Sequence, residues 1–486
     1  MKSYKLFIGG KWIKSVKGET FKSIDPSTGK PIAIFQKGNG EDIEKAVRAA
    51  EKALPAWKDT PAPKRGQILF KVAKLLKQNK DQLAKLMTQE MGKVLNEAKG
   101  DVQEAIDIFE YMGGEGRRLF GHTVPSELKD KFCMTIRQPL GVVGLISPWN
   151  FPIAIPSWKI APALICGNTV ILKPSSDTPF CAVKLIEILT EAGVPAGAVN
   201  LVTGPGSTAG TALIKHPRVR AISFTGSKET GKFVTENAGL KKVGLELGGK
   251  NPIIIMEDAN LKLALEGVLW GAFGTTGQRC TAASRVIIHK SVKEKFEKML
   301  LQSTKKLVLG SGLKKDTDIG PLVNKKAVEK VHHYTLIGKK EGAKLLCGGM
   351  PVNRPGYFYK PTIFTEVKPN MKIAQEEIFG PTIAIIPVKN LDEAINVANN
   401  VTYGLSSSIY TNDIRNAFIA IEKIEAGLTY VNSSTIGSEV HLPFGGTKDT
   451  GNGTREAGWT ALEEFSEVKT IYIDYSGRLQ KAQSIT

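Results

Sequence analysis

The stretch between residues 141 and 226 constrains the fold most, because short apolar runs alternate there with helix-like segments. Four of these runs are typical of buried strands, and a helical pattern follows each of the first three: "GVVGLI", "NTVILK", "AVNLV" and "AISFT". This β-α-β-α-β-α-β order predicts a parallel sheet with right-handed crossovers. Ligands of such sheets bind beyond the carboxyl ends of the strands, where Asn150, Lys173, Gly204 and Gly226 fall.

The rest of the chain extends this pattern. Apolar residues recur at helical spacing between 261 and 273, and further strand-like and helical runs follow from "RVIIHKSV" onward. At 486 residues the chain is long enough for two or three domains, so we expect a second α/β domain there. Residues 121–139 and the tail "EVKTIYIDYSG" also alternate like strands. Neither has an obvious partner in the two domains, which suggests pairing between subunits.

Composition excludes several classes of protein. The net charge of +19 comes from lysines dispersed among acids, which favours a solvated surface and anionic small molecules over nucleic acid. We find no apolar run long enough to span a bilayer and no signal-peptide stretch, so we expect a cytoplasmic protein. The five cysteines lack C-x-x-C spacing and the six histidines form no ligand motif, so we expect neither disulfides nor a metal.

The stretch "FTGSKETGKF" raises the possibility of a triphosphate site. Gly226, Gly231 and Lys232 have the G-x-x-x-x-G-K spacing, but Phe233 stands where the magnesium-binding hydroxyl should be. A turn between a strand and a helix can still bind a diphosphate through free backbone N–H groups, and it can also be an ordinary helix start. The glycine-rich "GPGSTAG", which contains Gly206, leaves the same two alternatives open.

Cys280 differs from the other four cysteines in its surroundings. It follows a Gly-Gln-Arg turn in "GQRCTAASR", and the adjacent Arg279 would favour the thiolate. Cys166 and Cys347 lie in apolar company, typical of buried thiols. Cys280 is therefore a candidate nucleophile, with a structural thiol as the alternative.

Seven motifs taken together resemble the aldehyde dehydrogenase superfamily, in order and spacing: "PWNFP", "LKPSSDTP", "SFTGS", "LELGGKNP", "GQRC", "EEIFGP" and "PFGGTKDTGNGTREAG". The resemblance covers nearly the whole chain. It implies an α/β fold with a Rossmann-like dinucleotide-binding domain (1–120 and 141–249) and a catalytic domain (250–448). It also implies an oligomerisation hairpin and tail (121–140 and 449–486), and hence a homodimer or homotetramer.

The resemblance assigns three catalytic residues. Cys280 matches the nucleophile that forms a thiohemiacetal and then a thioester with the aldehyde. Asn150 matches the residue that stabilises the negative oxygen, and Glu246 the general base that activates the hydrolytic water. Glu456 and Lys159 resemble a proton-relay pair, with a structural salt bridge as the alternative.

The resemblance also implies a nicotinamide cofactor. NAD-preferring relatives commonly carry Glu three residues after the ribose-binding Lys173, where this chain has Ser176. Without that negative charge we expect NADP to be used, with NAD possible. The implied cofactor-binding residues are Ser147, Trp149, Lys173, Ser176, Gly206, Thr225, Gly226, Ser227, Glu377 and Phe379.

The resemblance also makes Arg279 the candidate for substrate recognition, because the Arg of this motif binds the anion in family members that accept aldehydes with a distant carboxylate or phosphate, and a guanidinium suits that geometry. A structural Arg that faces a neighbouring loop is the alternative. Phe151 and Trp158 complete the expected substrate site. The C-terminal motif resembles enzymes acting on 2,5-dioxopentanoate, which we take as the expected substrate. Another semialdehyde or a broad range of aldehydes is the alternative. A cysteine hydrolase would need a histidine paired with Cys280, and no histidine lies in a recognisable motif.

Overall fold

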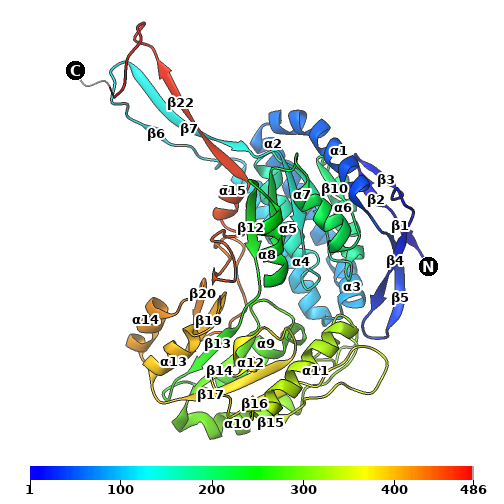
Figure 1. Cartoon of the computed structure of the whole chain (residues 1–486), viewed down its shortest axis with the longest axis vertical. Coiled ribbons are helices and arrows are strands. Elements are labelled where there is room, and N and C mark those ends of the chain that lie inside the picture. The colour runs from blue at the N-terminus through cyan, green and yellow to red at the C-terminus, as the bar shows by residue number, and fades with distance from the viewer. Residues whose placement is uncertain (484–486) are drawn as a thin grey trace.

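The computed structural model describes residues 1–483, and its body is built around two seven-stranded sheets (Figure 1). The first sheet has the strand order β12-β11-β8-β9-β10-β2-β3, and its first five strands are parallel, as the sequence predicts. The strands are β2 (Leu6–Ile8), β3 (Lys11–Ile13), β8 (Val142–Ile146), β9 (Thr169–Lys173), β10 (Val199–Leu201), β11 (Ala221–Thr225) and β12 (Lys242–Glu246).

Helices cover both faces of this sheet, which explains why its strands are apolar throughout. In β8, Val143 and Leu145 face one core while Val142 and Ile146 face the other. Helices α2 to α6 contribute to the first core, and α1, α7 and α8 to the second. The helices are α1 (Gly40–Asp59), α2 (Ala62–Gln78), α3 (Lys80–Met91), α4 (Leu95–Glu115), α5 (Ala154–Ile165), α6 (Pro179–Glu191), α7 (Thr211–Lys215) and α8 (Lys228–Asn237).

The second sheet follows directly after the first, because residues 247–250 carry the chain from β12 into β13. Its order is β15-β16-β17-β14-β13-β19-β20, with β15 antiparallel at one edge. This is the second α/β unit that the sequence predicts. Its strands are β13 (Asn251–Ile255), β14 (Ala283–His289), β15 (Lys344–Cys347), β16 (Thr362–Thr365), β17 (Thr382–Val388), β19 (Ser406–Tyr410) and β20 (Leu428–Val431).

The helices of this second unit also lie on both sides of their sheet, since alternate residues of β13 belong to different cores. Helix α9 lies between β13 and β14 in the chain and covers the predicted helical stretch. The helices are α9 (Leu261–Phe273), α10 (Lys290–Thr304), α11 (Lys325–Lys340), α12 (Lys372–Gln375), α13 (Leu391–Asn399), α14 (Ile414–Lys423) and α15 (Thr460–Glu464), of which α15 packs against α5 of the first unit.

The two outlying segments pair with each other and with neither seven-stranded sheet, a pairing within the chain that the sequence analysis does not predict. β22 (Ser466–Asp474) runs antiparallel to β7 (Lys131–Pro139) over their whole length, and β6 (Thr123–Val124) completes the predicted hairpin. Sequence reasoning missed this pairing because more than 300 residues separate the two strands. Figure 1 shows the three strands projecting as an arm from the body of the molecule.

Smaller elements complete the fold. β1 (Ser3–Tyr4), β5 (Lys30–Gln36) and β4 (Thr20–Asp25) form a three-stranded sheet, and β18 (Tyr403–Gly404) pairs with β21 (Thr447–Lys448). Within residues 1–483, no helix is long and apolar enough to cross a membrane.

Candidate active site

Cys280 lies in a tightly fixed loop between α9 and β14. The preceding turn (Gly274–Gly277) holds Thr275 and Thr276 in the left-handed region, at φ of 50° and 58°. The Asn251 side chain, at the start of β13, donates to the carbonyl oxygens of Cys280 (2.7 Å) and Ala282 (2.9 Å). The cysteine is therefore positioned by the second sheet.

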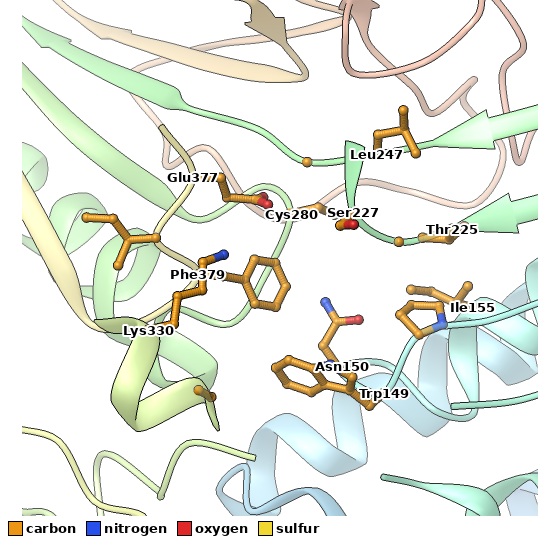
Figure 2. A pocket seen from close by; sticks show the side chains of 15 residues that line it. Trp149, Asn150, Ile155, Thr225, Ser227, Leu247, Cys280, Lys330, Glu377 and Phe379 are labelled. Carbon is orange, nitrogen blue, oxygen red and sulfur yellow. The ribbon is translucent and has the colours of Figure 1, made fainter. Parts of the chain in front are cut away.

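One side of Cys280 opens into a cavity of about 210 Å³, which we call the first cavity. The rings of Trp149 and Phe379 meet edge to face, 5.4 Å apart, at its wall. Figure 2 shows the Asn150 amide and the Phe379 ring pointing into this space. Its lining residues include Trp149, Asn150, Ile155, Thr225, Gly226, Ser227, Leu247, Gly248, Cys280, Lys330, Glu377 and Phe379.

The glycines of "LELGG" let Glu377 approach this cavity. A Cβ on Gly248 would lie 2.5 Å from a Glu377 carboxylate oxygen, and the Gly249 N–H donates to the other oxygen at 3.0 Å. Gly248 and Gly249 therefore connect the two sheets, and they also orient the Glu377 carboxylate at the wall of the first cavity.

On the other side of Cys280 is a smaller cavity of about 60 Å³, the second cavity. Cys280, Thr225, Leu247 and Ile155 line both cavities, so the thiol lies where the two adjoin. Its remaining lining residues are Glu104, Phe151, Trp158, Glu246, Arg279, Thr281, Gly437, Ser438, Phe444 and Glu456.

Asn150 is buried next to Cys280. Its amide nitrogen donates to the Gln278 carbonyl at 3.0 Å, which leaves the second N–H of the amide for another acceptor. Its amide oxygen is buried and has no protein partner. The loop that carries Cys280 therefore also orients the Asn150 side chain.

Glu246 ends β12 and is 3% exposed, and neither carboxylate oxygen has a protein partner. Burial, reinforced by the nearby Glu456 charge, raises the pKa of Glu246 well above its usual value. Gly445 makes room for this carboxyl, since a Cβ there would come within 2.6 Å of it.

A buried ion pair lies behind Glu246. Lys159, from α5, pairs with Glu456 and also donates to the Ser223 hydroxyl at 2.9 Å. Both side chains of the ion pair are almost completely buried. Glu456 itself lines the second cavity, so the pair connects that cavity to the interior of the first sheet.

The Cys280 thiol is not activated in the way the sequence suggests. Burial, together with the charges of Glu246 and Glu377, raises its pKa to about 12, and the backbone N–H groups of Thr281 and Cys280 only partly oppose this. The expectation that Arg279 favours the thiolate is therefore wrong. Adjacent residues in a turn need not point the same way, and the nearest charges are carboxylates.

Arg279 instead faces α4. Its Nη2 lies 3.3 Å from Glu97 Oε1, its Nε donates to the Thr275 hydroxyl at 2.9 Å, and its guanidinium carbon lies 5.4 Å from the Phe151 ring centre. Arg279 still lines the second cavity together with Phe151 and Trp158, the other two residues of the expected substrate site.

The predicted cofactor residues fall into two groups. Trp149, Thr225, Gly226, Ser227, Glu377 and Phe379 line the first cavity. The others lie outside it, in or after β8, β9 and β10 at the same edge of the first sheet: Ser147, Lys173, Ser176 and Gly206.

Several of these side chains have unmet hydrogen-bonding capacity. The hydroxyls of Ser147 and Thr225 are buried without a protein partner. Burial lowers the pKa of Lys173 to about 8. The Ser176 hydroxyl donates to the Gly204 carbonyl at 3.0 Å, which links the loops after β9 and β10. Ser227 caps α8 by accepting from the Thr230 N–H.

Sequence reasoning missed Glu104, which lines the second cavity, and Glu464, a buried acid that interacts with Glu456. Glu104 had a usable signal, since it lies three residues after Asp101 on the apolar face of a helix. Lys330 of α11 lines the first cavity, and no sequence pattern marked it as a site residue.

A sequence profile described as "Aldehyde dehydrogenase family" matches residues 12–471. The chain is 45% identical to the alpha-ketoglutaric semialdehyde dehydrogenase of Bacillus subtilis (97% of this chain, 98% of the relative). It is 41% identical to the 2,5-dioxopentanoate dehydrogenase of Saccharolobus solfataricus (97% and 99%). The NAD+ complex of an aldehyde dehydrogenase from Bacillus cereus superposes with a TM-score of 0.95, at 37% identity (98% and 97%).

Proposed function

The chain belongs to the aldehyde dehydrogenase family, and on that premise we propose that it oxidises 2,5-dioxopentanoate to the dicarboxylic acid with NADP+ or NAD+. The observation that carries the proposal is the place of Cys280 where two cavities adjoin. A nucleophile there can bind an aldehyde on one side while a dinucleotide occupies the other.

The residues around the first cavity suit a nicotinamide dinucleotide. The partnerless hydroxyls of Thr225 and Ser147 offer donors, the Trp149 and Phe379 rings offer apolar faces, and the start of α8 at Ser227 offers free N–H groups to a pyrophosphate. These residues would hold the nicotinamide beside Cys280, where it would supply a hydride acceptor for the substrate carbon. Ser176 carries no charge to repel a 2′-phosphate, which supports use of NADP+.

Cys280 acts as the nucleophile. Its sulfur bonds to the aldehyde carbon, and the carbonyl oxygen becomes negative. The free N–H of the Asn150 amide and the backbone N–H of Cys280 stabilise this oxygen. Because the thiol has a raised pKa, a neighbouring group must take its proton, and the Glu246 carboxyl in the adjoining cavity is suited to do so.

Glu246 also serves as the base that releases the product from Cys280. A carboxyl whose pKa is raised by burial is a better match for removing a proton from water than an exposed one. The water oxygen then attacks the thioester carbon, and the thiolate leaves. Lys159 and Glu456 lie behind Glu246 and pass the proton away from the site.

The substrate proposal rests on Arg279 and on the two similar enzymes named above. Arg279 lines the second cavity with its guanidinium, which can bind the carboxylate at the far end of a five-carbon substrate. One observation favours a second candidate, a broad range of uncharged aldehydes: Arg279 already pairs with Glu97.

Steady-state kinetics separate these candidates. We expect 2,5-dioxopentanoate to give a kcat/KM at least tenfold above that of pentanal, measured by absorbance of the reduced nicotinamide. Arg279→Ala should raise KM for the semialdehyde roughly 10- to 100-fold and leave KM for pentanal much less changed. Equal effects on both substrates would refute the carboxylate role of Arg279.

We also propose a cytoplasmic homo-oligomer assembled through the β6-β7-β22 arm. Val468, Tyr472 and Ile473 are exposed on this arm, and apolar side chains gathered on a projecting sheet are typical of a subunit interface. Light scattering on the intact chain and on a variant with these three residues changed to Ser measures whether the arm joins subunits. An unchanged molar mass would contradict this role.

A further inference from the structure

Glu104 is the acid of the second cavity that the proposed reaction leaves without a role. It lies on α4 and is half-buried, and it lines the same cavity as Arg279 and Cys280. Its helix also carries Asp101, which pairs with Lys93 at 2.9 Å with both side chains fully buried. Glu104 therefore lines the second cavity one helical turn away from a buried, compensated ion pair.

Positive charge gathers around Phe151, another residue that lines the second cavity. The Lys93 ammonium lies 3.8 Å from the centre of the Phe151 ring, and the Arg279 guanidinium carbon lies 5.4 Å from it. Each cation also pairs with an acid of α4, Arg279 with Glu97 and Lys93 with Asp101. These two ion pairs contribute no net charge, so an ionised Glu104 would leave this end of the cavity negative.

The ionisation of Glu104 is balanced near neutral pH. Burial raises its pKa to about 7, and Asp101 and Asp107 on the same helix act in the same direction. Arg279 and Lys93 act in the opposite direction. Glu246 and Glu456 are the other acids in the lining of this cavity, and Glu456 pairs with Lys159.

We propose that protonated Glu104 donates a hydrogen bond to the distal carboxylate of the substrate beside Arg279, and that ionised Glu104 repels this carboxylate. Glu104 is thus a specificity-determining residue whose protonation sets the preference for carboxylated over uncharged aldehydes. This inference rests on the proposed function. The substrate carboxylate itself stays ionised across the range concerned, since carboxyls of this kind titrate near pH 3 to 4.

The test is the pH dependence of a ratio in the wild-type enzyme. We compare kcat/KM for 2,5-dioxopentanoate with kcat/KM for pentanal, which has the same chain length and no carboxylate. Both react with the same thiol, so ionisation of Cys280 cancels in the ratio. We expect the ratio to be highest at about pH 6 and to fall, by up to about tenfold per pH unit, above pH 7.

Three variants show which residue is responsible. Glu104→Gln keeps a donor that cannot ionise, so its ratio should stay constant with pH and exceed that of the wild type at pH 8.5. Glu104→Asp keeps an ionisable group, so its ratio should still fall with pH. Glu110→Gln removes a charge from an exposed position of the same helix and should reproduce the wild-type profile.

Two outcomes overturn the inference alone: a wild-type ratio that favours the semialdehyde without changing with pH, or a Glu104→Gln ratio that keeps the wild-type slope. A wild-type enzyme that prefers pentanal at every pH overturns both the proposed substrate and this inference. The wild-type profile needs no variant, so poor folding of Glu104→Gln would not prevent the test.

Discussion

The two cavities beside Cys280 differ in how they are made. The first is lined by the ends of parallel strands, by loop backbone and by the rings of Trp149 and Phe379, with charge contributed by Lys330 and Glu377. The second is smaller and has four charged residues in its lining: Glu104, Glu246, Arg279 and Glu456. The first follows from the topology of the sheet. The second depends on side chains brought together from distant elements.

The two cavities therefore depend on different kinds of interaction for their specificity. Backbone N–H groups and aromatic faces can bind a dinucleotide with little dependence on pH. The second cavity must bind an aldehyde, move protons and exclude other substrates with buried acids whose ionisation depends on every neighbour. We therefore expect the effects of substitutions to be largest at the shared cysteine, then in the second cavity, and smaller in the first.

Replacing the shared residue should remove the function of both cavities. Cys280→Ala is expected to lower kcat by roughly 10⁴-fold or more, because the lining of the two cavities contains no other thiol. Dinucleotide binding, measured by fluorescence titration, should persist. The matched control is Cys347→Ala, in the second sheet and outside both cavities, which should retain activity. Substantial turnover by Cys280→Ala would exclude the covalent route.

In the second cavity, Glu246→Gln should slow release of the acyl group from Cys280. We expect roughly 10²- to 10³-fold loss of steady-state turnover, since an amide cannot accept the proton of water. Stopped-flow measurements should then show a burst of reduced nicotinamide, near one equivalent per active subunit, followed by a slow phase. A variant with no burst and a slow first turnover would mean that the earlier role of Glu246, accepting the proton of the Cys280 thiol, limits the reaction and not the release of the acyl group.

The same difference between the two cavities explains which parts of the structure could be predicted from the sequence. The parallel strands, the loop residues at their ends and the place of Cys280 are local patterns, and all were recovered. The raised pKa of Cys280 and the presence of Glu104 depend on contacts between α4, β12 and the cysteine loop, which spacing along the chain does not reveal. The β7–β22 pairing was missed for the same reason.

In the cofactor region, Ser176→Glu should reverse cofactor preference. A carboxylate at this position would repel a 2′-phosphate, so kcat/KM for NADP+ should fall about 10- to 100-fold while that for NAD+ changes little. Ser176→Ala is the control, because it removes the hydrogen bond to Gly204 without adding charge. If Ser176→Glu lowers kcat/KM equally for NADP+ and NAD+, the substitution acts by disturbing the loop and not by repelling the 2′-phosphate.

The carboxylates of both cavities also control the reactivity of the thiol. Because its pKa is about 12, alkylation of Cys280 by iodoacetamide in the cofactor-free enzyme should rise about tenfold per pH unit between pH 7 and 9. Glu377→Gln removes one of the charges that raise this pKa, so alkylation at pH 8 should become several-fold faster. A rate independent of pH across this range would mean that the thiol is already ionised.

The smallest effect is expected beyond the rim of the first cavity, at Lys232. Its spacing from Gly226 imitates a triphosphate loop, yet its side chain is exposed on α8 and lies 3.9 Å from Glu236, an exposed pair of little energetic weight. Lys232→Ala should therefore change KM for either cofactor less than twofold and the free energy of unfolding by less than about 0.5 kcal/mol. A tenfold rise in KM for NADP+ alone would show that the cofactor site extends along α8. Binding in the first cavity would then depend on side-chain charge, as it does in the second.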